Sequence, residues 1–223
     1  MERHFDEELQ DLKKNIIEMS SLSEEMIAES IIMLCERKGE LKQSIFEKED
    51  KINTMQIQID DTTFKLIALR QPAASDLRFL ISAIKINSDL ERIGDLAVNI
   101  AERAQELLEE PPLKPFIDLP RMAQISQGML KDAIDSFINR NSGLAKDVCL
   151  RDDTVDNLNE QIFRELLTYM FQNTKNINRA IKLTFISKYL ERIADHATNI
   201  AEDVCYMVEG KDIRHHIADK NQS

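Results

Sequence analysis

The chain has 223 residues with 40 acidic and 29 basic side chains, which gives a formal net charge of −11. This balance argues against sequence-independent binding to nucleic acid or to an anionic membrane surface, because both need an excess of Lys and Arg. Gly and Pro number five each, Trp is absent and aromatic residues make up 5%. Few helix breakers among many charged and aliphatic residues predict long helices and an all-α fold.

The cysteines and the apolar runs indicate the compartment. Cys35, Cys149 and Cys205 are far apart and form no CxxC pair, so they predict neither a disulfide framework nor a thiolate zinc site. They suit buried thiols in a reducing compartment. The N-terminal segment lacks the apolar stretch of a signal peptide, and no run of about 18 apolar residues predicts a spanning helix. We therefore expect a cytoplasmic protein without direct membrane insertion.

Helix-breaking sequences divide the chain into six segments. The breaks lie at Lys38-Gly39, Gln71-Pro72, residues 109–115 with Pro120, residues 141–143, residues 173–178 and Gly210. Between them, apolar residues recur at spacings of three and four, as on the buried face of a helix. Examples are Phe5, Leu9, Leu12, Ile16 and Met19, and then Ile52, Met55, Ile59, Thr62 and Leu66. The pattern predicts six helices of roughly 20 to 35 residues and no strand.

One sequence occurs twice. Residues 90–104 read LERIGDLAVNIAERA and residues 190–204 read LERIADHATNIAEDV, with ten of the fifteen positions identical. Asp50 likewise matches Asp153, at an offset of 103. The repeat predicts two tandem, pseudo-symmetric three-helix bundles, because short loops make consecutive helices antiparallel. The expected units are a first bundle at 1–110, a proline-rich linker at 111–120, a second bundle at 121–212 and a polar tail at 213–223.

The repeated segment carries acids opposite its apolar stripe. Because an α-helix turns 100° per residue, Leu90 and Ile93 mark the core face, whereas Glu91 and Asp95 fall on the far side with Asn99. We therefore expect these oxygens to face outward, one per turn. Like charges four residues apart destabilise a helix, but a row of such oxygens suits a hard or borderline cation. A solvated face without a ligand is the alternative interpretation.

The second and fifth segments offer further acids. Acids on antiparallel neighbouring helices could converge on one cation site per bundle. Asp153 and Asp156 stand in the second copy where the first has Asp50 and Asn53, so we expect the second site to bind metal more tightly. The candidate metal ligands are Glu91, Asp95, Asp50, Glu191, Asp195, Asp153 and Asp156. Asn99 and Asn199 are candidates for additional ligands or for hydrogen-bond donors to ligand carboxylates.

Other polar residues suggest less specific roles. Arg92 and its copy Arg192 could pair with neighbouring acids or bind an anion. His196 replaces Leu96 of the first copy, at an intermediate angle that favours a bundle-edge residue over a ligand. An anion could also bind where residues 76–78 (DLR) stand near a predicted helix start. Capping of that helix by Ser75 or Asp76 is the favoured alternative.

Four stretches together resemble the PhoU family of bacterial phosphate-uptake accessory proteins. They are QPAASDLRFL (71–80), DLERIGDLAVNIAE (89–102), DDTVDNLNEQIF (152–163) and YLERIADHATNIAEDVCYMVEGK (189–211). The resemblance implies two similar three-helix bundles and a homodimer. It implies a negative regulator acting between the cytosolic subunits of a phosphate ABC transporter and a sensor histidine kinase. It also implies iron or zinc at E(D)xxxD motifs, which match Glu91/Asp95 and Glu191/Asp195.

Three functional hypotheses follow. The first is a non-enzymatic regulator with bound metal, and the second is a helical scaffold without metal. The third, a carboxylate-bridged di-iron redox protein, needs inward Glu-x-x-His pairs. None of the four histidines has a Glu three positions earlier, which disfavours it. No Ser-His-Asp set or glycine-rich phosphate loop is recognisable.

Overall fold

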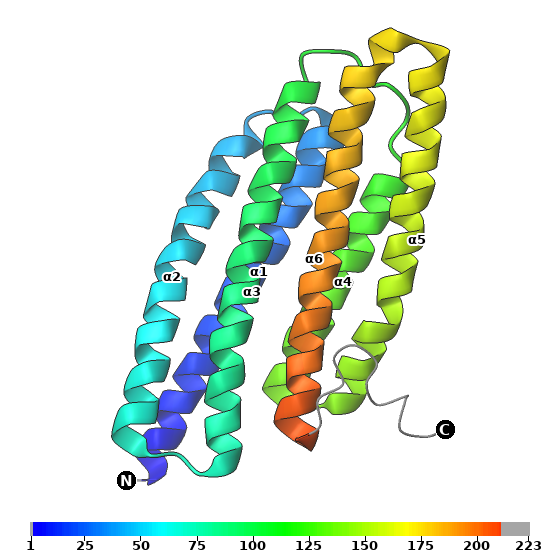
Figure 1. Cartoon of the computed structure of the whole chain (residues 1–223). Coiled ribbons are helices and arrows are strands. Elements are labelled where there is room, and N and C mark those ends of the chain that lie inside the picture. The colour runs from blue at the N-terminus through cyan, green and yellow to red at the C-terminus, as the bar shows by residue number, and fades with distance from the viewer. Residues whose placement is uncertain (1, 211–223) are drawn as a thin grey trace, which may run out of the picture.

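The computed structural model describes residues 2–210, which form six α-helices and one short 3-10 helix (Figure 1). They are α1 (Glu2–Glu36), α2 (Leu41–Arg70), α3 (Ala74–Leu107), α4 (Asp118–Asn139), α5 (Ser142–Gln172), η1 (Thr174–Asn176) and α6 (Ile177–Glu209). The α-helices have between 22 and 35 residues. This part of the chain contains no strand, which confirms the all-α prediction.

The helices end at the predicted breaks. Gln71, just before Pro72, and Gly210 adopt left-handed conformations with φ of 46° and 69°, which end α2 and α6 as such residues commonly do. α4 begins at Asp118, so the last residues of the predicted 111–120 linker are helical. Pro120 is tolerated there because the first turn of a helix needs no backbone donor. The predicted polar tail lies outside the described residues.

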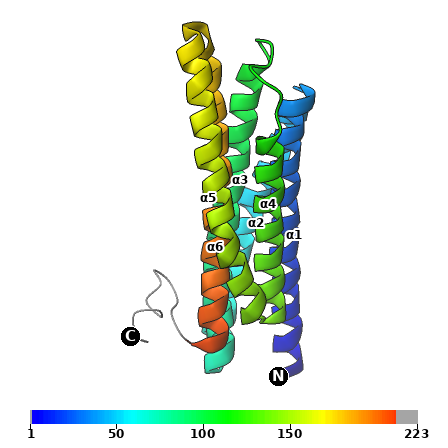
Figure 2. The same ribbon diagram turned by 90° about the vertical axis from the view of Figure 1, so that its right-hand side faces the viewer.

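The helices form two layers. α2, α3, α6 and α5 lie side by side, and α1 and α4 cover one face of that row (Figures 1 and 2). α3 contacts α1, α2 and α6, whereas α6 contacts α3, α4 and α5. The predicted pair of three-helix bundles is therefore present as α1–α3 and α4–α6. They join along α3 and α6, a contact that we call the seam.

The predicted apolar stripes form the core. Leu12, Ile16 and Met19 of α1 are fully buried, and so are Ile52 and Ile59 of α2. The expected position of Thr62 is wrong by one residue. Thr63 is buried instead, and its hydroxyl donates to the carbonyl of Ile59 at 2.7 Å. This bond satisfies the hydroxyl inside the helix, so a polar residue lies in the core with its donor paired.

The two bundles run antiparallel across the seam. At one end, Lys85 of α3 forms an ion pair with Asp203 of α6, with 2.7 Å between Nζ and Oδ1. At the other end, Arg179 of α6 lies 3.4 Å from Glu110, which follows α3. Early residues of one helix thus meet late residues of the other. An antiparallel contact between two copies of one sequence places a pseudo-twofold axis across the seam.

Buried serines repeat the same contact in both bundles. Ser23 of α1 lies 3.5 Å from the carbonyl of Leu90, and Ser126 of α4 lies 3.2 Å from the carbonyl of Leu190. Both leucines begin the repeated LERI sequence. A small side chain at these points lets the backbones approach closely. The duplicated sequence therefore packs in the same way twice.

The proline-rich linker is fixed to the second bundle. Lys114 is 8% exposed and forms an ion pair with Glu165 of α5. Arg179 donates to the carbonyl oxygen of Pro111 at 2.9 Å. The ion pair of the buried lysine and the hydrogen bond to the backbone leave the linker little freedom, so it joins the bundles in a fixed arrangement.

Candidate functional site

The first carboxylate cluster lies between α2 and α3. We define it as Glu49 and Asn53 of α2 with Glu91 and Asp95 of α3. The amide of Asn53 donates to Glu49 at 2.8 Å, one turn apart. Partial burial, followed by repulsion from Asp95 and Glu49, raises the pKa of Glu91. The four side chains therefore form one electrostatically coupled group across two helices.

The second carboxylate cluster occupies the equivalent place between α5 and α6. We define it as Asp152, Asp156, Glu191 and Asp195, which correspond to the first cluster at offsets of 103 and 100. Glu191 accepts a hydrogen bond from Lys188 on one oxygen, whereas its other oxygen is buried without a partner. Four acids with one compensating lysine leave an excess of negative charge at this place.

Repulsion inside the second cluster changes its proton affinities. Burial, followed by repulsion from Asp156 and Asp195, raises the pKa of Asp152 to about 6, against a smaller lowering by the Thr198 hydroxyl. Partial burial and then Glu191 raise the pKa values of Asp156 and Asp195. Burial disfavours the charged form and like charges add to that effect. A cation placed among these oxygens would offset both the cost of burying the charged carboxylates and the repulsion between them.

The predicted outward orientation is confirmed for Asp195, which is exposed, but needs correction for Glu91 and Glu191. The side chains of Glu91 and Glu191 are only 23% and 13% exposed. They lie at the edges of α3 and α6, facing the neighbouring helix. The helical wheel allowed for one buried stripe per helix, but α3 and α6 each pack against three helices, so a wider arc of each is covered.

The remaining predicted ligands lie beside the clusters. Asp50 and Asp153 are exposed, one position away from Glu49 and Asp152. Asp153 still raises the pKa of Asp156, as a minor contribution after burial and Glu191. The amide of Asn99 donates to the carbonyl of Asp95 at 2.9 Å, which occupies it within its own helix. These residues therefore lie next to the clusters and are less suited to be their central ligands.

Sequence reasoning missed Glu49 and Asp152. The offset of 103 that paired Asp50 with Asp153 pairs these two residues equally well. They also stand four residues before Asn53 and Asp156, the same spacing as Glu91 to Asp95. The spacing is therefore a usable signal, but a helical wheel gives weight only to residues opposite the core. Interhelical clusters form instead beside the core, where two helices face each other.

The side chains do not converge as a metal site in their present positions. Among residues 2–210, no three or more His, Cys, Asp or Glu side chains are grouped closely enough to hold a metal ion. The clusters supply suitable oxygen donors, and two of those oxygens, on Asp152 and Glu191, are buried without a hydrogen-bond partner. Metal binding would therefore require the carboxylates to turn toward one another.

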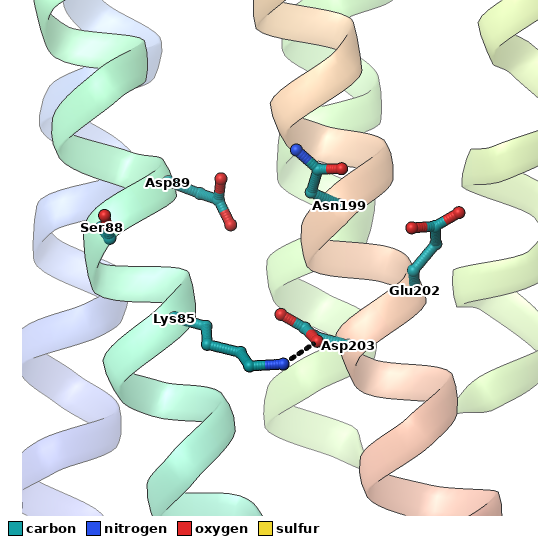
Figure 3. A pocket seen from close by; sticks show the side chains of 6 residues that line it. All are labelled: Lys85, Ser88, Asp89, Asn199, Glu202 and Asp203. Atoms are coloured by element: carbon teal, nitrogen blue, oxygen red, sulfur yellow. Dashed lines mark hydrogen bonds and ion pairs between the residues drawn. The ribbon is translucent and has the colours of Figure 1, made fainter. Parts of the chain in front are cut away.

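A groove follows the seam between α3 and α6 (Figure 3). It encloses about 320 Å³ and is lined by Lys85, Ser88, Asp89, Asn199, Glu202 and Asp203. The ion pair of Lys85 with Asp203 crosses it (Figure 3). Asn199, a predicted additional ligand, therefore lies in this groove. His196 lies 2.8 Å from Asp89, so it links the two bundles rather than standing at a free edge.

The fold and the paired clusters define an all-helical protein built from two copies of one acid-bearing three-helix unit. The PhoU domain model matches the chain twice, at residues 16–104 and 119–204. These ranges cover most of α1–α3 and of α4–α6. The chain belongs to the PhoU family.

Similar proteins match over nearly the whole chain. The "phosphate-specific transport system accessory protein PhoU homolog" of Aquifex aeolicus is 43% identical, covering 96% of this chain and 98% of the relative. The homolog of Caulobacter vibrioides is 40% identical over 95% and 92%. The crystal structure of PhoU from Pseudomonas aeruginosa superimposes with a TM-score of 0.89 at 38% identity, covering 93% of this chain and all of that one.

A second solved structure is more distant. It is the "phosphate transport system regulatory protein PhoU" from Streptococcus pneumoniae, with a TM-score of 0.84 at 29% identity, covering 93% and 98%. The two-bundle arrangement is therefore retained as sequence identity falls. Within the described part of this chain, no helix is long and apolar enough to cross a membrane.

Proposed function

We propose that this protein is a non-enzymatic regulator that negatively controls phosphate uptake and phosphate-starvation signalling. The observation that carries the proposal is the full-length similarity to phosphate-specific transport system accessory proteins. Its working place would be the cytoplasmic side of the membrane, where it acts as a homodimer. Its partners would be the cytosolic subunits of a phosphate ABC transporter and a phosphate sensor histidine kinase.

The surface supports a docking role. Large apolar side chains are exposed on several helices, including Ile57 and Phe64 of α2 and Phe163 of α5. The net charge of −11 favours partners with basic surfaces. Ile57 and Phe64 are two helical turns apart and so lie on one face of α2, and contiguous exposed apolar residues mark sites that bind other proteins.

Co-purification tests the docking role. Full-length protein would be mixed with the transporter's cytosolic subunits or with the kinase's cytosolic part, and complexes separated by size. We expect association with at least one of them, weakened by Phe64→Ser or Phe163→Ser but not by Arg164→Gln, an exposed control on α5. Absence of association with both partners would overturn the proposal.

We further propose that iron or zinc binds at the carboxylate clusters. Four acids, including the buried unpaired oxygen of Glu191, fit a hard or borderline cation in the second cluster. The first cluster has an amide, Asn53, in place of Asp156, so it should bind more weakly. A bound metal would supply positive charge that offsets the repulsion among the acids and would change the surface presented to a partner.

Elemental analysis tests the metal. Protein purified without added metal or an affinity tag would be compared with Glu191→Gln/Asp195→Asn, and with Glu91→Gln/Asp95→Asn for the first cluster. Stoichiometric metal that is lost mainly in the Glu191/Asp195 variant supports the proposal. Metal-free wild-type protein that still binds its partners would instead support a scaffold without metal.

A further inference from the structure

A pair of cations lies over one aromatic ring at the end of the molecule where α3 begins. Lys13 Nζ of α1 lies 5.4 Å from the ring centroid of Phe79 in α3, and the Arg140 guanidinium, just after α4, lies 5.6 Å from it. Phe79 is fully buried and stacks on Phe137, with 4.7 Å between centroids and 8° between planes. The rings hold both cations beside a rigid, apolar platform.

Lys13 has no carboxylate partner among the described residues. Besides lying over the Phe79 ring, its Nζ donates a hydrogen bond to the carbonyl oxygen of Ile138, near the C-terminal end of α4, at 3.5 Å. Burial, followed by repulsion from Arg140, lowers the pKa of Lys13. The adjacent Lys14, in contrast, forms an ion pair with Asp11 at 2.8 Å. In a chain with 40 acids and 29 bases, a partly buried lysine whose charged neighbour is another cation indicates a place that favours negative charge.

The start of α3 adds donors to this place. Arg140 Nη2 lies 3.4 Å from Asp76 Oδ1 in the first turn of α3, so the guanidinium and that turn are adjacent. Ala73 is the N-cap, and no side chain caps the helix. The capping expected of Ser75 or Asp76 is therefore absent. Uncapped N–H groups at a helix start attract anions, and the helix dipole strengthens the attraction.

We propose that Lys13, Arg140 and the first turn of α3 bind one small tetrahedral oxyanion. An ammonium and a guanidinium offer several charged donors, which suits the oxygens of phosphate or sulfate. Asp76 at present occupies one guanidinium donor and competes with such a ligand.

The proposed oxyanion site is separate from the carboxylate clusters. Twelve residues along α3, from Phe79 to Glu91, correspond to about 18 Å at the rise of an α-helix. It also occurs once per chain. The second copy has Asn176 and Arg179 at the positions of Asp76 and Phe79. The proposal therefore stands independently of the regulatory function and of the metal.

Calorimetric titration with inorganic phosphate tests the proposal. The full chain would be titrated at constant ionic strength with a chelator present, so that metal in the clusters contributes no binding. We expect saturable binding of one phosphate, with sulfate as a competitor. Lys13→Gln and Arg140→Gln should each weaken it about tenfold, as loss of a charged hydrogen bond does. Lys14→Gln, the matched control, should leave it unchanged.

Asp76→Asn separates binding from folding. Removing the competing carboxylate should tighten phosphate binding severalfold, a gain that a folding defect cannot produce. Circular dichroism would confirm equal helicity of the variants. No saturable binding to the wild type, equal affinity in Lys13→Gln, or weaker binding in Asp76→Asn would each overturn the proposal.

Discussion

Asp89 and His196 meet across the seam, with 2.8 Å between Oδ1 and Nδ1, and thereby connect the two bundles. Their side chains are 17% and 18% exposed. The pseudo-twofold axis maps this pair onto Tyr189 and Leu96, which lie seven residues away along α6 and α3. The Asp89–His196 pair therefore has no polar counterpart on the other side of the axis, and it lies on the side that contains the groove.

Replacing His196 tests the strength of this connection. We expect His196→Leu to lower the free energy of unfolding by about 1 kcal/mol, because Asp89 loses its partner in a half-buried place. Asp89→Asn in the His196→Leu background should cost much less than in the wild type. Urea unfolding of the four proteins of this double-mutant cycle gives the coupling. Additive effects would show that the contact contributes nothing to stability.

Ile52 and Gly94 share one packed space, in which the large side chain of one compensates for the missing side chain of the other. A Cβ added to Gly94 would lie 3.3 Å from Ile52 Cδ1. The second copy has Val155 and Ala194 at these positions, so one methyl group has moved from one partner to the other. We predict that Ile52→Val alone costs about 1 kcal/mol through the space it leaves, and that Gly94→Ala alone is close to neutral, because helix propensity offsets crowding.

The double variant Ile52→Val/Gly94→Ala should be more stable than the sum of the single variants. The new methyl group fills the space left by Cδ1, so crowding and cavity both disappear. Thermal and urea unfolding measure the difference. Gly128→Ala is the matched control, because only the Arg151 side chain approaches its Cβ position, at 3.8 Å. A double variant no better than additive would refute the matching of volumes.

Stability should depend on the protonation of Asp152. Its pKa is about 6 in the folded protein and 3.8 ordinarily, so the folded state binds the proton more tightly. The unfolding free energy of the metal-free protein should therefore fall as pH rises from about 4 to 6. The change is on the order of 1 kcal/mol once solvent screening is allowed for. Asp152→Asn should flatten the profile in urea titrations over this range, whereas Asp153→Asn should not.

Glu191 should control the proton affinity of its neighbours. Partial burial and then Glu191 raise the pKa values of Asp156 and Asp195. We expect Glu191→Gln to lower both pKa values, since an amide carries no charge to repel them. Carboxyl chemical shifts followed by NMR against pH would show it. Glu91→Gln in the first cluster is the control, and unchanged values in Glu191→Gln would mean that burial alone sets them.

Local sequence determined the helices and their duplication. Breakers such as Pro72 and Gly210 act on the residues next to them, and the spacing of Leu12, Ile16 and Met19 defines a buried face within one helix. Both signals depend on a few neighbouring residues, so they can be read without knowing the fold. The repeated LERI segments also predict that there are two bundles, because similar sequences pack in similar ways.

Only the tertiary structure decided which acids come together. A helical wheel separates Glu91 from the core but cannot show that neighbouring helices cover its side. It therefore predicted an outward row, whereas the structure partly buries Glu91 and Glu191 and leaves Asp195 exposed. For the same reason the sequence pattern points to Asp50 and Asp153 and not to Glu49 and Asp152. The contact of His196 with Asp89 joins residues 107 apart in sequence. Such positions depend on how the two bundles pack, and that arrangement is set by burial summed over six helices.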